Sequence, residues 1–205
     1  MTDTVRIDTA LLLAFTWFSW VGAVTPGPNT LLALATAVNF GASSVRAHMV
    51  GVIAGTAFLM AAVLTGMYSI LAAFPAVGWT LKWLGVAWLV WMGIGLMRAG
   101  ELGARTMIRP PRVYESALLQ LANGKGWMLL AATAAAWRGL ASPAWLDVLL
   151  LTAIHASSCA LALVVWAATG QALAAWLRIG RRNALFNAAM GASLIATALW
   201  MSAQS

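Results

Sequence analysis

The sequence predicts an all-α integral membrane protein, with six transmembrane helices arranged as two inverted three-helix repeats whose first helices are broken. Composition is the first reason, because 62% of the 205 residues are hydrophobic, 8% are charged and the mean hydropathy is +0.87. A soluble domain with a wetted surface does not have this composition. The second reason is that hydrophobic segments of about 20 residues, the length that crosses a bilayer, follow one another along the chain. The third is that the first and fourth segments are interrupted at corresponding places.

The first hydrophobic segment extends from about residue 9 to residue 38 and has helix-breaking residues in its middle. Two prolines remove two backbone donors and obstruct the carbonyls one turn earlier, so the helix must break inside the membrane. Broken backbone is tolerated there only when it is buried in protein or lines a wet cavity. Proline also suits the first turn of a new helix, whose N-terminal amides attract an anion such as a carboxylate. The expected substrate-binding residues of this break are Thr25, Pro26, Gly27, Pro28 and Asn29.

Two other interpretations of the first segment remain open. In one, the prolines only kink a helix and shape its packing. Alternatively, residues 10–24 form the apolar part of a signal peptide, since Arg6 precedes them and small residues follow. Five further hydrophobic segments favour a transmembrane helix over this second alternative.

The second hydrophobic segment covers about residues 47–73 and the third about residues 79–97, with a turn composition between them. Gly51 and Gly55 lie at helical spacing in the second segment and predict close helix packing. An arginine-rich stretch follows, which predicts a loop and a repeat boundary. The expected units are a first three-helix repeat (residues 1–98), a basic cytoplasmic loop (99–112) and a second three-helix repeat (113–205).

The fourth segment, about residues 113–137, contains a polar interruption. Asn29 and Asn123 are 94 residues apart, which is close to half the chain. An odd number of spans in each half gives the halves opposite orientations, and matching interruptions then indicate a substrate site between the repeats. Lys125 either neutralises a substrate carboxylate or extends to the membrane interface. The residues expected from this half are Gln120, Asn123 and Lys125.

The fifth segment covers about residues 145–177 and the sixth about residues 184–201. In the fifth, His155 shares a helical face with Thr152 and Ser158. Histidine titrates near neutral pH, which makes His155 the first candidate for proton coupling. The alternative is a packed, neutral histidine bonded to a neighbouring carbonyl.

Two further titratable residues are interpreted by their position. Asp147 is the second candidate for proton coupling, and its alternative is a solvated helix cap near the periplasmic end. His48 lies beside Arg46 and is interpreted as part of the topological signal.

Basic residues are distributed unequally between the predicted loops, and the richer side of a membrane protein faces the cytoplasm. That side collects Arg46, Arg98, Arg105, Arg109, Arg112, Arg178, Arg181 and Arg182. The other side has Arg6, Arg138 and at most Lys82. We therefore predict a multi-pass protein of a bacterial inner membrane, with lipid as its surroundings and both termini in the periplasm. Because the basic residues are dispersed, no nucleic acid partner is expected.

Catalytic residues, cofactors and metal sites are not expected. The sequence has neither a nucleophile elbow nor a phosphate-binding glycine loop. Its single cysteine, Cys159, excludes a multi-cysteine metal site, and its two histidines fall in different segments without nearby acidic ligands. Tryptophans near span ends are typical of the aromatic belt. A sugar site is the alternative for Trp17, Trp20, Trp88 and Trp91.

The chain resembles the lysine/homoserine exporter (LysE/RhtB) family over nearly its full length. In the first half the resemblance lies in Thr25-Pro26-Gly27-Pro28-Asn29-Thr30, Ala37-Val38-Asn39-Phe40-Gly41, Gly51 to Gly55, and the pattern from Leu84 to Gly93. In the second half, the stretch from Leu119 to Trp127 is similar to the family's Asn-Pro-Lys segment, with Gly124 at the position of the family's proline. Glycine permits a helix break without imposing one, so this departure bears on substrate identity or on gating of the second half.

The resemblance implies a six-span inverted-repeat fold, export of amino acids or related metabolites, and coupling to the proton gradient. The resulting hypothesis is a secondary exporter of amino acids or closely related small metabolites. The alternatives are a membrane scaffold or sensor subunit that transports nothing, and an exporter of a different small solute. Glycine-rich helix faces make a homodimer a further possibility.

Overall fold

The computed structural model describes residues 5–67, 73–98, 109–177, 179 and 181–203. Most of the basic loop expected at 99–112, with Arg105, and also Arg178 lie outside the described residues. The α-helices are α1 (Thr9–Val24), α2 (Pro28–Phe40), α3 (Arg46–Ala62), α5 (Pro75–Arg98), α6 (Val113–Leu121), α7 (Gly124–Ala136), α8 (Ala144–Leu177) and α9 (Arg182–Ala203). Shorter elements are a 3₁₀ turn at Ala42–Val45, a π-helical turn at Val63–Met67, and strands β1 (Arg6–Ile7) and β2 (Ala141–Ser142), which pair antiparallel.

Both expected interruptions are helix breaks. The first hydrophobic segment folds as α1 and α2, which are bent by 54° at the break. The fourth folds as α6 and α7, which are separated by Ala122 and Asn123. The helix boundaries expected from sequence therefore agree closely with the structure in these segments, and also for α8 and α9.

The described residues contain four helices long and apolar enough to cross a membrane, or up to five spans if the bent pair α1–α2 counts as one. The four are the helices around α3, α5, α8 and α9. α6 and α7 are short, with 9 and 13 residues. The structure thus has the all-α membrane architecture that the sequence predicts, while six spans and an inverted repeat remain predictions.

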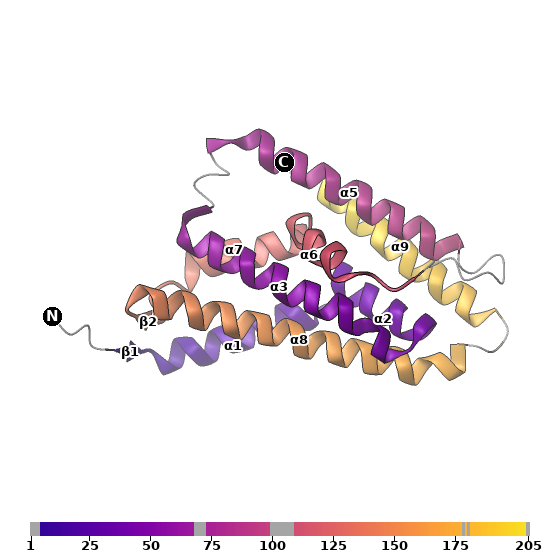
Figure 1. Ribbon diagram of the computed structural model, residues 1–205, viewed down its shortest axis with the longest axis horizontal. Helices are drawn as coiled ribbons and strands as arrows, with labels where there is room; N and C mark the ends of the chain where they lie inside the picture. Colours follow the sequence, from indigo (N-terminus) through magenta and orange to yellow (C-terminus); the bar gives the residue numbers. More distant parts are fainter. Residues whose placement is uncertain (1–4, 68–72, 99–108, 178, 180, 204–205) are drawn as a thin grey trace.

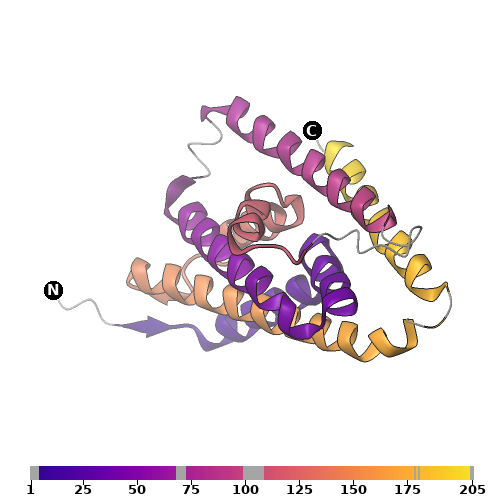
Figure 2. The ribbon, with the colours of Figure 1, turned by 45° about the vertical axis from the view of Figure 1, so that its right-hand side comes forward.

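α2 is the central helix of the molecule. Every residue from Thr30 to Val38 is buried, and Ala33, Ala35 and Ala37 are completely inaccessible. In Figure 1, α3 and α8 extend along one another with α1 and α2 behind them, and α5 lies beside α9. Figure 2 shows the α5–α9 pair along one side of the other helices, and a shared core cluster packs it against α2 and α6.

Glycines allow three pairs of helices to approach closely. On α3, a Cβ added at Gly51 would collide with the carbonyl of Val113 in α6, and one added at Gly55 would lie 2.8 Å from the carbonyl of Ala117. On α8, a Cβ added at Gly170 would lie 2.7 Å from the carbonyl of Leu34 in α2. Gly93 of α5 faces Gly191 of α9 in the same way. Small residues at such contacts are typical of helices packed in membranes, which confirms the prediction for Gly51 and Gly55.

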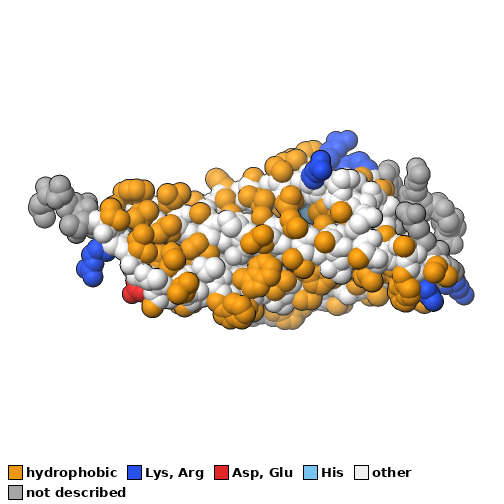
Figure 3. All heavy atoms as spheres, turned by 90° about the horizontal axis from the view of Figure 1, so that it is seen from below, with side chains coloured by type: hydrophobic (Ala, Val, Ile, Leu, Met, Phe, Trp, Pro, Cys, Tyr) orange, Lys and Arg blue, Asp and Glu red, His pale blue; other side chains and the backbone are white. Residues whose placement is uncertain are grey.

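Large apolar side chains cover the outside of the helices. Hydrophobic side chains extend over most of the face seen in Figure 3, and the few charged ones lie at its ends and along its upper edge. Trp17, Phe58 and Leu185 each expose about two thirds of their surface, at 69%, 66% and 69%. A soluble protein does not expose so much contiguous apolar area, so this surface faces lipid.

Candidate functional site

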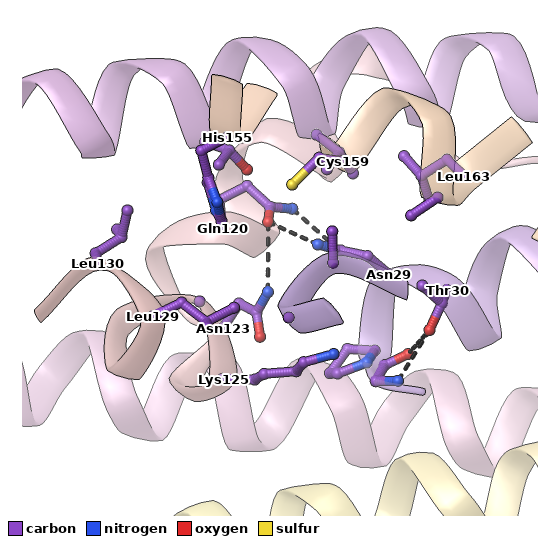
Figure 4. A pocket seen from close by; sticks show the side chains of 18 of the residues that line it. Asn29, Thr30, Gln120, Asn123, Lys125, Leu129, Leu130, His155, Cys159 and Leu163 are labelled. Atoms are coloured by element: carbon purple, nitrogen blue, oxygen red, sulfur yellow. Dashed lines mark hydrogen bonds between the residues drawn. The ribbon is translucent and has the colours of Figure 1, made fainter. Parts of the chain in front are cut away.

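The two helix breaks meet at a cavity of about 50 Å³. Its walls come from the α1–α2 break, α3, the α6–α7 break and α8 (Figure 4). Six of the eight residues predicted to bind substrate line it: Gly27, Pro28, Asn29, Gln120, Asn123 and Lys125. Among the remaining residues of the first break, Thr25 reaches the site through its backbone carbonyl, which accepts a hydrogen bond from the Lys125 Nζ.

At the first break, Gly27 is the N-cap of α2 and Pro28 is its first residue. The Gly27 N–H donates to the Thr30 Oγ1 at 2.9 Å, and the Thr30 hydroxyl donates back to the Gly27 carbonyl at 3.0 Å. The next backbone N–H groups, of Asn29 and Thr30, belong to the first turn, where an α-helix leaves amides without an intrahelical acceptor. This end of α2 therefore presents partial positive charge beside the cavity.

At the second break, α6 ends at Leu121 and Asn123 becomes the N-cap of α7 without a side-chain capping bond. The Asn123 side chain is 5% exposed, and its Oδ1 has no hydrogen-bond partner among the described residues. An acceptor left unpaired in a buried place is costly and needs an explanation. A donor supplied by a bound molecule would provide one.

Side-chain donors satisfy carbonyls that the breaks leave without helical partners. The Trp166 Nε1 donates to the Val24 carbonyl at 3.0 Å, and the Trp127 Nε1 donates to the Leu121 carbonyl at 2.8 Å. Lys125 does the same for Thr25. Because unsatisfied backbone is expensive inside a membrane, these three donors stabilise the broken conformation.

The two breaks are joined by a reciprocal pair of side-chain amides, Asn29 and Gln120, which we call the amide pair. The Asn29 Nδ2 donates to the Gln120 Oε1 at 2.8 Å, and the Gln120 Nε2 donates to the Asn29 Oδ1 at 3.1 Å (Figure 4). A longer bond, 3.4 Å, connects the Asn123 Nδ2 to the Gln120 Oε1. Asn29 and Asn123 correspond in sequence spacing, and the amide that bonds directly to Asn29 is Gln120.

Lys125 projects from α7 across the first break. A Cβ added at Gly27 would lie 2.9 Å from the Lys125 Cδ, so the glycine leaves room for the lysine side chain. The ammonium group is held at the Thr25 carbonyl, beside the N-terminus of α2. Lys125 is thus a cation within the site.

A family model described as LysE type translocator matches residues 20–205 of the chain. The chain belongs to this family. An uncharacterized membrane protein of Pseudomonas aeruginosa is 33% identical over 175 residues, which are 78% of this chain and 79% of that protein. Cysteine/O-acetylserine efflux proteins of Escherichia coli are 32% identical over 117 residues in strain O1:K1 and 29% over 115 residues in strain K12. Each match covers 56% of this chain and 59% of the relative. No solved structure matches the chain.

This LysE type translocator is therefore a multi-pass transporter of the bacterial inner membrane, and not an enzyme. Its surroundings are lipid and its ligand is a small molecule. The lysine/homoserine exporter resemblance noted from the sequence is confirmed by the family match.

The two candidates for proton coupling lie in different places in the translocator. His155 is 2% exposed, lines the cavity from α8, and shares a 2.9 Å hydrogen bond between its Nδ1 and the Ser19 Oγ of α1. Asp147 is 2% exposed, which makes the solvated-cap alternative wrong. Its carboxylate accepts from the Gly139 and Ala141 N–H groups at 3.2 and 3.1 Å and pairs with Arg138 at 3.4 Å, so it holds the turn before α8.

His48 contacts the site through Asn29, a role that the sequence interpretation missed. It is completely buried on α3, where its Nε2 donates to the Asn29 backbone carbonyl at 3.0 Å and its Nδ1 lies 2.8 Å from the Ser116 Oγ. The interpretation as a topological signal is wrong, because the ring faces the helix core. One signal could have found it: His48 precedes Gly51 by three residues and so shares the face that packs on α6.

A second cavity, of about 460 Å³, lies between α5 and α6. Trp88 and Trp91 line it, with ring centroids 5.2 Å apart, and Ser116 forms part of its wall. Arg109 and Glu115 at its edge form an ion pair. The Glu115 carboxylate, by hydrogen bonding to the Arg109 guanidinium, raises the pKa of that arginine above its usual value.

Proposed function

We propose that this translocator exports a small amino acid with an uncharged side chain, or a closely related metabolite, and binds it as a zwitterion between the two helix breaks. One observation carries the proposal. The same cavity has a lysine ammonium and a helix N-terminus at one break and, at the other, a buried amide oxygen that has no hydrogen-bond partner among the described residues.

The substrate carboxylate is assigned to the first break. Lys125 supplies a full positive charge there, and the first turn of α2 supplies N–H groups with the positive end of the helix dipole. Broken helices hold anionic groups of substrates in other transporters by the same physics. The Lys125 ammonium is the cation expected to leave the Thr25 carbonyl and bind the carboxylate.

The substrate ammonium is assigned to the second break. The Asn123 Oδ1 is buried and lacks a partner among the described residues, and an ammonium is a strong donor for such an oxygen. A ligand with a carboxylate and an ammonium on neighbouring atoms satisfies both ends of the cavity. The α-amino carboxylate unit has this arrangement.

The remaining residues of the cavity wall favour a substrate whose side chain is uncharged. Among the described residues that line the cavity there is no carboxylate, and the remaining wall is mainly apolar, with Val52, Leu59 and Leu163 on α3 and α8. A cationic side chain would be buried here without a counter-charge, which is costly. The name of the E. coli relatives gives cysteine and O-acetylserine, which agrees with this class.

Export is proposed to use alternating access between two inverted halves, with the cytoplasmic side marked by the basic loops and both termini in the periplasm. His155 is the proposed proton-coupling residue, because it faces the cavity and bonds α8 to α1 through Ser19. Its hydrogen-bond partner is the buried Ser19 hydroxyl, and not the backbone carbonyl that the alternative interpretation of His155 predicts. Asp147 lies among the residues of a structural turn and is assigned no part in coupling.

The test is transport of labelled amino acids into inside-out membrane vesicles. Wild-type protein should accumulate cysteine or O-acetylserine more efficiently than lysine or arginine. Asn29→Ala and Lys125→Ala should abolish accumulation without preventing membrane insertion, because each removes a group from the first break. Asn39→Ala is the matched control, since Asn39 is another α2 amide, bonded to Asn187 and away from the cavity. Wild-type vesicles that accumulate nothing would favour the scaffold or sensor alternative.

A further inference from the structure

His48 connects three helices at the wall of the site. Its Nε2 must carry a proton, because the Asn29 carbonyl at 3.0 Å can only accept. In the neutral ring the Nδ1 is then an acceptor, and the Ser116 hydroxyl donates to it at 2.8 Å. His48 therefore bonds α2 on one side and α6 on the other.

These bonds belong to a closed ring. The Ser116 carbonyl accepts from the Gln120 Nε2 at 2.7 Å, one turn later on α6, and Gln120 is bonded to the Asn29 side chain. The ring thus passes from His48 to Ser116, Gln120, Asn29 and back to His48. Asn29 is held twice, by its side chain in the amide pair and by its backbone carbonyl on His48.

This ring of hydrogen bonds joins two tightly packed helices, α3 and α6, which we call the frame, to the broken helix α1–α2. α3 and α6 cannot slide past each other easily, since Gly51 and Gly55 bring their backbones into contact. His48, Ser116 and Gln120 all belong to this frame. Asn29, in contrast, lies in the first turn after the break between α1 and α2, where the chain can hinge with less loss of helical hydrogen bonding.

The cavity in this arrangement is small. Its volume of about 50 Å³ has room for a few water molecules, whereas ligand pockets have volumes of roughly 300–1,000 Å³. The amide pair lines it (Figure 4). An amino acid therefore fits only if the groups that line the cavity, Asn29 and Gln120 among them, move apart.

We propose that His48 is a positioning residue that holds Asn29 in this contracted arrangement, so that its bond to the Asn29 carbonyl breaks when the site widens to admit substrate and forms again when the site contracts. The proposal rests on the export function proposed above and adds how the site is gated. His48 acts through Asn29 and touches no substrate.

The only cysteine in the chain provides a direct probe, because Cys159 lines the same cavity. In purified protein reconstituted in lipid, we would measure the rate at which N-ethylmaleimide modifies Cys159. His48→Ala should raise that rate roughly fivefold, about the effect of losing one net hydrogen bond from the contracted state. His48→Gln should give an intermediate rate, since its amide N–H can still reach the carbonyl, and Ser116→Ala should raise the rate less than His48→Ala.

Asn187→Ala is the matched control for nonspecific loosening. Asn187 is completely buried on α9 and bonded to Asn39, away from the ring. The rate at which N-ethylmaleimide modifies Cys159 in Asn187→Ala should equal that of wild type. Acceleration by Asn187→Ala equal to that by His48→Ala would overturn the proposal, as would wild-type rates in both His48 variants. If His48→Ala does not insert, wild-type rates in both His48→Gln and Ser116→Ala would overturn it equally.

Transport kinetics separate positioning from binding. His48→Gln should lower the maximal rate of transport while changing the substrate KM little, because gating is impaired and the binding groups remain. A raised KM with an unchanged maximal rate would assign His48 to substrate binding and overturn the positioning role. Cysteine labelling does not require transport, so a failure of the export function would leave the gating result interpretable.

Discussion

At the scale of single residues, the polar groups of the site could be predicted from the sequence but their partners could not. Spacing places Asn29 and Asn123 at corresponding positions of the two halves, but it does not show that the amide bonded to Asn29 is Gln120. The reason is local: Asn123 is the N-cap of α7 and its oxygen has no partner among the described residues, whereas Gln120 in the last turn of α6 has the reach to bond across the cavity. His48 was missed because its partners, Ser116 and Asn29, come from distant parts of the chain.

Asn123→Leu tests the role of the unpaired oxygen. Removing an acceptor for a substrate ammonium should raise the KM roughly tenfold or more, since a hydrogen bond to a charged group contributes about 1.5–3 kcal/mol. The measurement is the concentration dependence of uptake into inside-out vesicles. Asn123→Asp, which keeps an oxygen acceptor and adds negative charge, should bind at least as well as wild type. An unchanged KM in Asn123→Leu would remove Asn123 from the site.

At the scale of elements, the helix breaks were predictable because their causes are local. Pro26 and Pro28 exclude a continuous helix at the first break. The second break occurs without a proline: Asn123 adopts an extended conformation, with φ −88° and ψ 92°, and the Trp127 indole satisfies the Leu121 carbonyl. Gly124 therefore occupies the family's proline position without loss of the break. The pairing of α3 with α6 and of α5 with α9 was not predictable, because it depends on how glycine faces find each other in three dimensions.

Gly51→Ala tests the contact between α3 and α6. The added methyl group would meet the Val113 carbonyl and the Ser116 side chain, so the helices must separate. The expected destabilisation is about 1–3 kcal/mol, typical of overpacking, and it should lower the melting temperature in detergent. Gly95→Ala is the control, because a Cβ at Gly95 has nothing within 4 Å among the described residues, and alanine is the better helix former. Equal melting temperatures for the two variants would contradict the proposed frame.

At the scale of the whole molecule, composition alone determined the surroundings of the protein. An apolar exterior with charged residues near its ends follows from 62% hydrophobic and 8% charged residues once the chain is helical. The number of spans was harder to derive, since α6 and α7 are each too short to cross a bilayer by themselves. α6 and α7 form one broken span if the second break lies deep in the membrane, and composition does not encode that depth.

Orientation is the prediction that belongs to this scale. Most arginines gather on one predicted side, which should therefore face the cytoplasm, whereas the C-terminus should face the periplasm. These arginines are Arg46, Arg98, Arg109, Arg112, Arg181 and Arg182. Alkaline phosphatase fused after residue 205 should therefore be active, and a green fluorescent protein fused there should be dark. Fusions after Arg98 should give the reverse pattern, which controls for expression. A fluorescent C-terminal fusion with an inactive phosphatase counterpart would place the C-terminus in the cytoplasm, and the predicted orientation of the second half would then be wrong.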